Sequence, residues 1–522
     1  MERAEKWDRL AEGCDVLVIG GGATGLGIAV DAATRGFRTA LVEAGDFAQA
    51  TSSRATKLVH GGVRYLANGQ LHLVYEALRE RRIMLRNAPH LVHRLGFVTP
   101  AYRWMDLPFY GAGLKAYQLL AGGSSLGATE IWSARRTQEA VPGIHAEGLL
   151  GSVLYFDGQF DDARYALALA RTAEDSGATV LNYARCMALV QSHGRTSGAR
   201  VRDAESGREV EVSARVIVNA GGIFLDELRQ MEDPASLPLL KASRGTHLVV
   251  PGSVLGGEYA LMIPKTRDGR LIFAIPWMGQ CVIGTTDVPV SGVAMEPGHS
   301  REELSFLMET ISPYLQTPIR EAEIRSVFSG LRPLVSGNAA STAKLSREHL
   351  ITASPGGLIT IAGGKWTTYR RMAQDTLDFA AKGGWIERRP CRTDTVPLHG
   401  ATEAPVADAR LARYGTDAEA VVALERQHPE WSRALHPRLP FTAAEVVYAA
   451  RAEMARTVED VLSRRMRALL LDAEAAVACA MPVATLLADE LGRSQEWVAE
   501  QVQAFTRLAQ EFYLYRGSAT AG

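Results

Sequence analysis

Apolar and polar positions alternate in blocks that predict strands and helices in the first part of the chain. Residues 15–19 (DVLVI) are apolar and β-branched, which predicts a buried strand. A glycine-rich stretch at 20–25 follows, and a helix is predicted from there to about Arg35. Residues 38–42 (RTALV) predict a second strand, which ends at Glu43. Strand, glycine turn, helix and strand in this order are typical of a unit that binds a dinucleotide.

Further along, the pattern predicts two more helices and leaves one region unassigned. Residues 71–88 have a strong amphipathic period. Residues 161–176 predict an alanine-rich helix, with Asp161 or Asp162 as its N-cap. Residues 103–132 mix aromatic residues with glycines and fit no regular element.

The middle of the chain changes to strand-like runs separated by turn signals. Residues 241–352 predict an antiparallel sheet, with a hairpin turn at 268–269 and one helix at 301–315. Two further apolar runs, at 214–219 and 357–362, predict buried strands, and a glycine turn follows each of them. The first sheet is therefore expected to be assembled from segments that are far apart in the sequence.

The glycines after the first strand match the dinucleotide motif G-x-G-x-x-G between a strand and a helix, the context that makes it informative. Gly20 permits the tight turn, Gly22 lets a pyrophosphate approach the backbone, and Gly25 lets helix and strand pack closely. Glu43 can bind ribose hydroxyls and would repel a 2′-phosphate, which argues against NADP. A glycine turn in an unrelated α/β protein is the alternative.

The layout of the sheet favours FAD over NAD, because glycine-terminated strands recur at 220–222 and 363–364 with a β-rich segment between them. The second of these turns would place a helix N-terminus near the flavin, where its dipole stabilises the anionic reduced ring. We predict an α/β fold, with an FAD-binding Rossmann-like domain interleaved with an antiparallel-sheet substrate domain, plus a C-terminal all-helical domain. The predicted segments are 1–80, 151–235 and 353–387 for FAD binding, 81–150 for an insert or cap, 236–352 for the substrate sheet and 388–522 for the helical domain, which begins with a linker at 388–405.

Composition and charge are those of a soluble globular protein, with 47% hydrophobic and 22% charged residues and a net charge of −1. Global charge gives no reason to expect nucleic-acid binding, so any anion site must be built from a few cations gathered locally. The five cysteines are scattered without a C-x-x-C pair, which excludes a zinc ribbon, favours a reducing compartment and leaves no metal site to predict. No secretory signal and no membrane-spanning stretch are recognised, so a cytoplasmic location is expected.

Several longer stretches then point to a family. The segments VIGGGATGLGIAVDAATRG, ATSSRATKLVHGGVRYL, IPWMGQCVIGTTDV, SGLRPL and AGGKWTTYR lie in matching order over about residues 15–370, and the chain resembles the FAD-dependent, quinone-linked glycerol-3-phosphate dehydrogenases. The resemblance implies oxidation of sn-glycerol 3-phosphate to dihydroxyacetone phosphate, with the hydride taken by non-covalent FAD and the electrons passed to a membrane quinone. It also implies peripheral attachment to the inner face of the cytoplasmic membrane, and a homodimer is a further expectation.

The resemblance and the glycine motif together imply a set of cofactor contacts. These are Gly20, Gly21, Gly22, Ala23, Thr24, Gly25, Glu43, Thr51, Ser52, Ser53, Lys57, His60, Gly61, Gly62, Met187, Ala220, Gly221, Gly363, Gly364, Lys365, Trp366 and Thr367. His60 lies in a glycine loop where some other flavoenzymes attach FAD covalently, but the resemblance implies a non-covalent contact at the flavin side.

For the substrate, the resemblance implies a phosphate clamp. Arg332 and Arg347 are assigned to the phosphate, because a planar guanidinium binds two phosphate oxygens at once. Arg64 and Tyr65 should lie nearby, and Lys365 should face the flavin and the substrate oxygens. Surface charges are the alternative for these arginines.

The reaction removes a hydride from a secondary alcohol carbon, so the hydroxyl must also lose a proton. His247 is the expected general base, because a histidine pKa lies close to neutral pH. Arg64 or Lys365 would stabilise the developing alkoxide. His247 as a buried sheet residue with a structural hydrogen bond, and Trp277 as an ordinary core residue rather than a pocket wall, are the alternatives.

Membrane contact has two candidate segments, residues 103–121 with interfacial aromatics and the basic helix at 76–86. A loop that covers its own core is the alternative for the first. Arg464, Arg465 and Arg467 could meet acidic lipid heads, although a solvated helix face is the simpler interpretation. Three other functions stay open: an oxidase that passes electrons to oxygen, an amine or amino-acid oxidase of the same fold, and a non-enzymatic flavin-binding protein.

Overall fold

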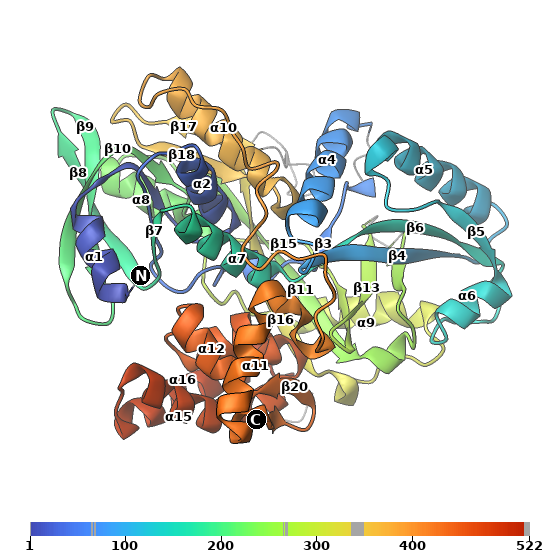
Figure 1. The fold of residues 1–522 in the computed structure, drawn as a ribbon. Helices are drawn as coiled ribbons and strands as arrows, with labels where there is room; N and C mark the ends of the chain where they lie inside the picture. The colour runs from blue at the N-terminus through green and yellow to red at the C-terminus, as the bar shows by residue number, and fades with distance from the viewer. Residues whose placement is uncertain are drawn as a thin grey trace.

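The structure is a computed structural model that describes residues 2–63, 66, 69–264, 266, 270–335 and 349–515. Two β-sheets lie side by side, and a mainly helical domain lies below them in the view of Figure 1. The predicted site residues Arg64, Tyr65 and Arg347 fall outside the described residues, as does the predicted turn at 268–269.

The first sheet is built around β1 (Cys14–Ile19), which pairs in parallel with β2 (Thr39–Val42) and β10 (Glu209–Asn219). β10 pairs in parallel with β18 (Ile359–Gly363), so the sheet is assembled from distant segments, as predicted. The remaining strands of this sheet are β7 (Thr179–Leu181), β8 (Ala184–Ser192), β9 (Arg195–Asp203) and β17 (His349–Ala353).

Helices cover both faces of this sheet, which explains why its strands read as continuous apolar runs. On one face α2 (Ala23–Thr34) packs between α7 (Asp162–Asp175) and α10 (Tyr369–Lys382). The other face carries α1 (Arg3–Ala11) and α8 (Leu225–Glu232). The Asp161 side chain caps α7 by accepting hydrogen bonds from the N–H groups of Ala163 and Arg164, as predicted.

The second sheet is mainly antiparallel and has the strand order β15-β11-β14-β13-β12-β4-β6-β3, with β16 beside β11 and β5 beside β6. The predicted region supplies β11 (Leu240–Pro251), β12 (Ala260–Ile263), β13 (Ile272–Trp277), β14 (Gln280–Gly284), β15 (Val288–Val290), β16 (Ser326–Val335) and the predicted helix, α9 (Arg301–Ile311). β3 (Leu58–Val59), β4 (Val92–Ala101), β5 (Glu130–Ser133) and β6 (Gly151–Phe160) come from earlier in the chain. The sheet is therefore wider than its predicted segment, and the domain boundaries stay predictions.

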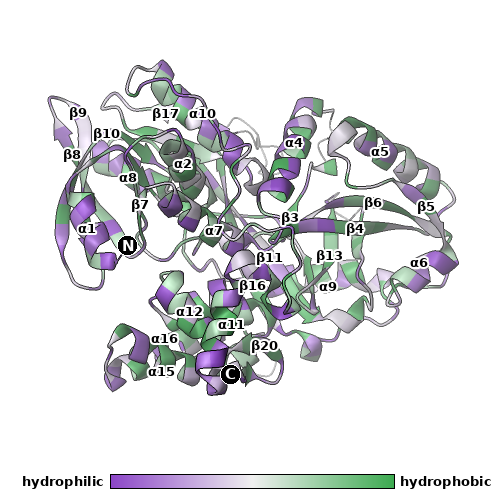
Figure 2. Ribbon diagram, in the orientation of Figure 1, coloured by the Kyte–Doolittle hydropathy of each residue, from purple (hydrophilic) through white to green (hydrophobic). Residues whose placement is uncertain are grey.

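The region at 103–132, which fitted no element, contains α5 (Asp106–Ala121). Only one narrow side of this helix is buried, through Leu114, Tyr117 and Ala121. Most of its other residues are apolar as well, although Asp106, Lys115 and Gln118 are polar, and Figure 2 shows this mixture along the helix. The regular polar face that normally reveals a surface helix is therefore weak. α4 (Leu71–Asn87) packs beside it, and α6 (Ala134–Ala140) follows β5.

The C-terminal domain is mainly helical, and residues 388–405 before it contain no helix or strand, as a linker should. Its helices include α11 (Ala418–Gln427), α12 (Ala443–Ala452), α13 (Ala468–Leu471), α14 (Ala473–Ala478), α15 (Ala480–Leu491) and α16 (Gln495–Phe512). A short hairpin, β19 (Ala434–His436) with β20 (Leu439–Thr442), is the one departure from an all-helical domain within the described part of the chain. Apart from this hairpin, the predicted fold class is confirmed.

Both interpretations of the arginine cluster in this domain are wrong. Arg464, Arg465 and Arg467 are at most 2% exposed, so they are neither a solvated helix face nor available to lipid. Instead they pair with five carboxylates that the fold brings to them, those of Asp46, Asp161, Asp162, Glu459 and Asp460. No helix among the described residues is both long and apolar enough to cross a bilayer.

Candidate active site

The first of two cavities lies at the carboxyl end of β1, where the strands of the parallel sheet end in glycine turns. Predicted cofactor residues that line it are Gly20, Gly22, Glu43, Thr51, Ser52, Ala220 and Gly221. They come from three separate segments, which meet because β2 and β10 flank β1. This is the place where open parallel sheets bind their ligands.

The glycine turn leaves a backbone cradle that no other residue could form. A Cβ atom at Gly25 would lie 1.9 Å from the carbonyl oxygen of Gly20, and one at Gly20 would lie 2.4 Å from that of Ala220. Gly20 also has a φ of +117°, which other residues rarely adopt. Helix α2 therefore begins directly against the strand ends, with its N-terminus beside the cavity, as a pyrophosphate requires.

Hydrogen-bonding groups around the cradle match the donor and acceptor groups of FAD. The Ala23 N–H donates to Ser52 Oγ at 2.9 Å, and the Gly21 N–H donates to the Glu43 carboxylate at 2.6 Å. Burial in the site raises the pKa of the Glu43 carboxyl, and the backbone N–H groups that it accepts from oppose this rise. Ribose hydroxyl donors would stabilise the same carboxylate further, so the residues present fit the adenosine and pyrophosphate end of FAD.

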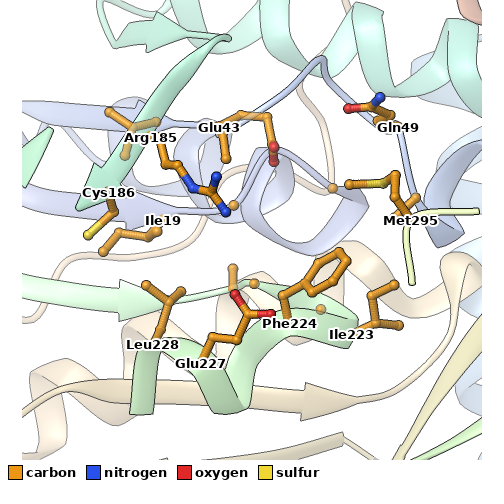
Figure 3. A pocket seen from close by; sticks show the side chains of 18 of the residues that line it. Ile19, Glu43, Gln49, Arg185, Cys186, Ile223, Phe224, Glu227, Leu228 and Met295 are labelled. Atoms are coloured by element: carbon orange, nitrogen blue, oxygen red, sulfur yellow. The ribbon is translucent and has the colours of Figure 1, made fainter. Parts of the chain in front are cut away.

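Several residues of this cavity were missed from the sequence. Arg185 of β8, Phe224, Glu227 of α8 and Met295 all line it. Figure 3 shows the Arg185 guanidinium entering the cavity from one side, with Phe224 and Glu227 on the other. The sequence prediction chose Met187 on the same strand, but Met187 does not line the cavity and is 39% exposed. The register of β8 against β9 shifts between Cys186 and Ala188, so the regular alternation of a strand does not carry over from Arg185 to Met187.

The second cavity is lined by residues of the antiparallel sheet and holds two arginines, Arg270 and Arg332, together with two aspartates, Asp157 and Asp287. His60, Gly62 and Arg332 line it, as do Arg270 and Asp287, which had not been predicted. His60 and Gly62 belong to the segment that runs on from the loop lining the first cavity. Of the predicted cofactor residues, His60 and Gly62 thus line the second cavity rather than the first.

Arg332 is held in place by its neighbours in the sheet. Its Nη2 donates to Thr285 Oγ1 and to the Thr286 carbonyl oxygen, each at 3.1 Å. The Asp287 carboxylate lies 3.4 Å from Nη1. Gly245 makes room for the guanidinium, because a Cβ there would lie 2.4 Å from Nη2. The guanidinium is 24% exposed and oriented before any anion arrives.

His247 lies on β11 and is only 2% exposed. Its ring stacks on Phe328 with 4.6 Å between centroids, and its Nε2 lies 3.0 Å from the Thr56 hydroxyl, which itself lines the second cavity. Burial is the main cause that lowers the pKa of His247 well below its usual value, and the charges of Lys57 and Arg332 lower it further. The imidazole is therefore neutral, and these surroundings make it a weaker base than a free histidine.

Lys57, predicted to contact the cofactor, lines neither cavity. Its ammonium is completely buried and donates to the Asp162 carboxylate at 2.7 Å and to the Ser53 carbonyl oxygen at 2.9 Å. It also lies 5.1 Å from the Phe328 ring centroid, on which His247 stacks. In this position Lys57 does not line the site but packs behind the residues that do.

The turn at 363–368 is fixed against the loop that lines the first cavity. Gly363 and Gly364 have φ values of +76° and +80°, and Lys365 is the N-cap of the 3-10 helix Trp366–Thr368, which leads into α10. The Trp366 indole donates to the Ser52 carbonyl oxygen at 2.8 Å, so the turn is fixed against the loop that lines the first cavity. The turn residues 363–367, together with Gly61 and Ser53, line neither cavity.

Comparisons with known proteins agree with this architecture. Residues 15–370 match the family described as FAD dependent oxidoreductase, and residues 358–498 match the C-terminal domain of alpha-glycerophosphate oxidase. The chain is 38% identical over 543 residues to a mitochondrial glycerol-3-phosphate dehydrogenase of Arabidopsis thaliana, covering 95% of this chain and 85% of the relative. It is also 38% identical over 537 residues to the mitochondrial glycerol-3-phosphate dehydrogenase of Homo sapiens, covering 96% and 73%.

Solved structures include the glycerol-3-phosphate dehydrogenase from Bacillus halodurans complexed with FAD, with a TM-score of 0.79, 28% identity and coverage of 98% of this chain and 97% of that one. The L-alpha-glycerophosphate oxidase from Mycoplasma pneumoniae with FAD bound shares the fold, with a TM-score of 0.55, 15% identity and coverage of 73% and 98%. On the strength of the matched family and of relatives similar over nearly the whole chain, this protein belongs to the FAD-dependent glycerol-3-phosphate dehydrogenase family.

Proposed function

We propose that the protein oxidises sn-glycerol 3-phosphate to dihydroxyacetone phosphate with FAD as the hydride acceptor. The observation that carries the proposal is the second cavity, where a preoriented Arg332 and a second cation, Arg270, line a space next to the segment that holds the cofactor. Bound FAD would supply the electrophilic ring that takes up the hydride. The names of the similar proteins support the same reaction.

In this proposal the chain holds FAD non-covalently, through the glycine cradle at the pyrophosphate and Glu43 at the ribose. Trp366 and the loop at 51–53 fix the strand-to-helix turn beside the flavin. His60 contacts the flavin side of the second cavity, since it lines that cavity. Lys365 faces the flavin and the substrate, at the start of the helix whose dipole favours negative charge on the ring.

The substrate phosphate binds to Arg332 in this proposal, because a planar guanidinium can bind two phosphate oxygens at once. Arg64, Tyr65 and Arg347 complete this clamp in the proposal, on the strength of the family resemblance alone. Phosphate binding fixes the alcohol carbon for hydride transfer, which needs the reacting atoms within about 3–3.5 Å.

The proton of the alcohol leaves as the hydride departs, and His247 is its acceptor in this proposal. The Thr56 hydroxyl lies between His247 and the cavity, so it can pass the proton from the substrate hydroxyl to Nε2. Substrate binding would help, because a phosphate dianion on Arg332 offsets one of the charges that lower the pKa of His247. The base thus becomes stronger when the substrate is in place.

We further propose a membrane quinone as the electron acceptor, at a surface that includes α4 and α5. Trp104, Phe109 and Leu119 are 71–78% exposed on and next to α5. Arg79, Arg82 and Arg86 line a cleft between α4 and the end of α5. Exposed aromatics beside basic residues are typical of a protein that rests on an anionic bilayer. Attachment to the inner face of the cytoplasmic membrane follows from this proposal, and the homodimer stays a prediction.

Anaerobic addition of glycerol 3-phosphate to the FAD-loaded protein tests the proposal. We expect rapid bleaching of the flavin absorbance, with no bleaching by glycine or proline at the same concentration. Faster bleaching by an amino acid would overturn the substrate assignment, and no bleaching by any substrate would favour a non-enzymatic flavoprotein. Readmitting oxygen or a quinone then distinguishes the acceptors, because an oxidase releases peroxide and a dehydrogenase reduces the quinone.

Substitution of Arg332 tests the observation on which the proposal rests, the phosphate site in the second cavity. Arg332→Ala should raise KM for glycerol 3-phosphate by about 100-fold, the equivalent of about 3 kcal/mol for a charged hydrogen-bonded contact, and leave FAD bound. Arg332→Lys should recover part of the loss, since it keeps the charge without the planar fork. Loss of FAD from both variants would contradict the assignment.

A further inference from the structure

The C-terminal domain contacts the loop that lines the first cavity, although it contributes no residue to either cavity itself. This loop, residues 43–53, follows β2 and includes Glu43, Asp46, Gln49, Thr51 and Ser52 among the cavity residues. Three buried arginines of the C-terminal domain, Arg464, Arg465 and Arg467, bind this loop through Asp46 and Ser53.

Asp46 is the first contact point and is completely buried. Its carboxylate accepts hydrogen bonds from Arg464 Nε and from both terminal nitrogens of Arg465, one of them at 2.9 Å. Asn182 donates to the same carboxylate at 3.1 Å. A buried carboxylate needs such partners, because an uncompensated charge in the interior costs several kcal/mol.

Two further contacts follow along the loop. Gln49 donates to the Glu459 carboxylate at 3.2 Å, and Glu459 in turn accepts from Arg464 at 2.6 Å. Arg467 donates to the Ser53 carbonyl oxygen at 2.7 Å. The C-terminal domain therefore contacts the loop near its beginning, middle and end.

The backbone of the C-terminal domain is irregular where it supplies these arginines. Residues Asp460–Arg465 form a single π-helical stretch, a feature that is frequent at functional sites. Arg467 has a φ of +69°, in the left-handed region that a non-glycine residue occupies only when its surroundings enforce it. The enforcing contacts are those to Ser53 and, at 2.8 Å, to Asp162.

The arginines also reduce the electrostatic repulsion between two acidic residues on the loop. Glu43 and Asp46 lie close together, and the negative charge of Asp46 contributes to the raised pKa of Glu43. Both carboxylates line the cavity, but the guanidinium groups of Arg464 and Arg465 neutralise Asp46, whereas Glu43 accepts hydrogen bonds from the N–H groups of Gly21 and Gly45. A ribose-binding carboxylate must be ionised to accept two hydroxyl donors, so this neutralisation serves the cofactor.

We propose that Arg464, Arg465 and Arg467 are positioning residues of the FAD site, which hold the loop at 43–53 in its cofactor-binding conformation. FAD affinity then depends on the C-terminal domain, although this domain does not line the cavity. The inference rests on FAD binding in the first cavity and not on the identity of the substrate.

The test measures the dissociation constant of FAD, by titrating the apoprotein and following flavin fluorescence. Glu459→Gln is the mild variant, since Glu459 is 25% exposed and lines no cavity. Arg465→Gln is the strong variant. Arg171→Gln is the matched control: Arg171 of α7 forms an ion pair with Asp417 of the C-terminal domain at 2.6 Å, without contacting the loop.

We expect FAD to bind about 3-fold more weakly to Glu459→Gln and at least about 10-fold more weakly to Arg465→Gln, and within about 2-fold of normal to Arg171→Gln. Far-UV circular dichroism of each apoprotein confirms that the fold is present, and if Arg465→Gln does not fold, Glu459→Gln decides alone. An equal change in Glu459→Gln and Arg171→Gln, or no change in Glu459→Gln, would overturn the proposal. Because the readout is FAD binding, neither result bears on the substrate.

Discussion

Two arginine-rich segments look alike in sequence and have opposite surroundings in the structure. Residues 79–86 (RERRIMLR) lie on α4, where Arg79, Arg82 and Arg86 are exposed. Residues 464–467 (RRMR) lie in the C-terminal domain, where all three arginines are buried. The difference shows that the role of a cation is set by the carboxylates that the tertiary structure brings to it.

The same contrast occurs within α4 itself. Arg81 is 1% exposed and donates to Asp157 at 2.6 Å, while its neighbour Arg82 is exposed. Helical periodicity separates these two neighbours, since successive residues point about 100° apart. In the C-terminal segment, helical periodicity does not predict which arginines are buried. A π-helical stretch and a left-handed residue change the directions of the side chains there.

The largest effect on stability is expected from a substitution among the buried arginines of residues 464–467. Arg467→Gln removes one donor from the Ser53 carbonyl oxygen and one from the Asp162 carboxylate, and leaves Lys57 as the other buried donor to both. We expect the free energy of unfolding in urea to fall by about 3–5 kcal/mol, whereas Arg82→Gln should change it by no more than about 0.5 kcal/mol. Equal losses in the two variants would mean that burial does not distinguish the two segments.

The exposed arginines of α4 should instead contribute to membrane binding. Replacing Arg79, Arg82 and Arg86 together by Gln should weaken binding to anionic vesicles by about 100-fold, at about 1 kcal/mol for each cation near the surface. Binding of FAD should not change. Vesicles of zwitterionic lipid serve as the control, and unchanged binding to anionic vesicles would place the membrane contact elsewhere.

A smaller, pH-dependent effect is expected where α7 meets the C-terminal domain. His399 lies between two carboxylates, with Nε2 2.9 Å from Asp417 and Nδ1 2.6 Å from Asp175, and Arg171 and His90 lie nearby. The hydrogen bond to Asp417 raises the pKa of His399, with a further contribution from Asp175, against burial and the charge of Arg171. A raised folded-state pKa stabilises the protein below the unfolded value, and this stabilisation is lost as the pH rises through the folded value.

His399→Gln should therefore be less stable than the parent by about 1–2 kcal/mol at a pH below about 6.5, with the difference disappearing at alkaline pH. Urea unfolding over a pH series measures it. A difference that grows with pH would show that the imidazole is neutral in the folded protein. The expected loss is smaller than for Arg467→Gln, because this contact is 20% exposed.

Local signals predicted much of the fold. β1, α2 and β2 were recognised because buried strands, a glycine turn and a capped helix each leave a mark within a few residues. α5 was missed because its exposed side is mostly apolar. The strands β4 and β6 pair with each other across about fifty residues of sequence, a contact that no short-range signal marks. Arg185 and Glu227 were missed because they reach the first cavity only after distant elements come together.

By itself, the sequence determined the glycine cradle, the acidic residue at the end of β2 and the family, because these depend on residues at fixed short spacing. Only the tertiary structure decided which charges are buried and what they do. Lys57 supports the site from beneath, Thr56 lies between His247 and the second cavity, and Arg465 binds Asp46 across more than four hundred residues of sequence. Such pairings depend on how separate elements pack, and no pattern within a single segment encodes them.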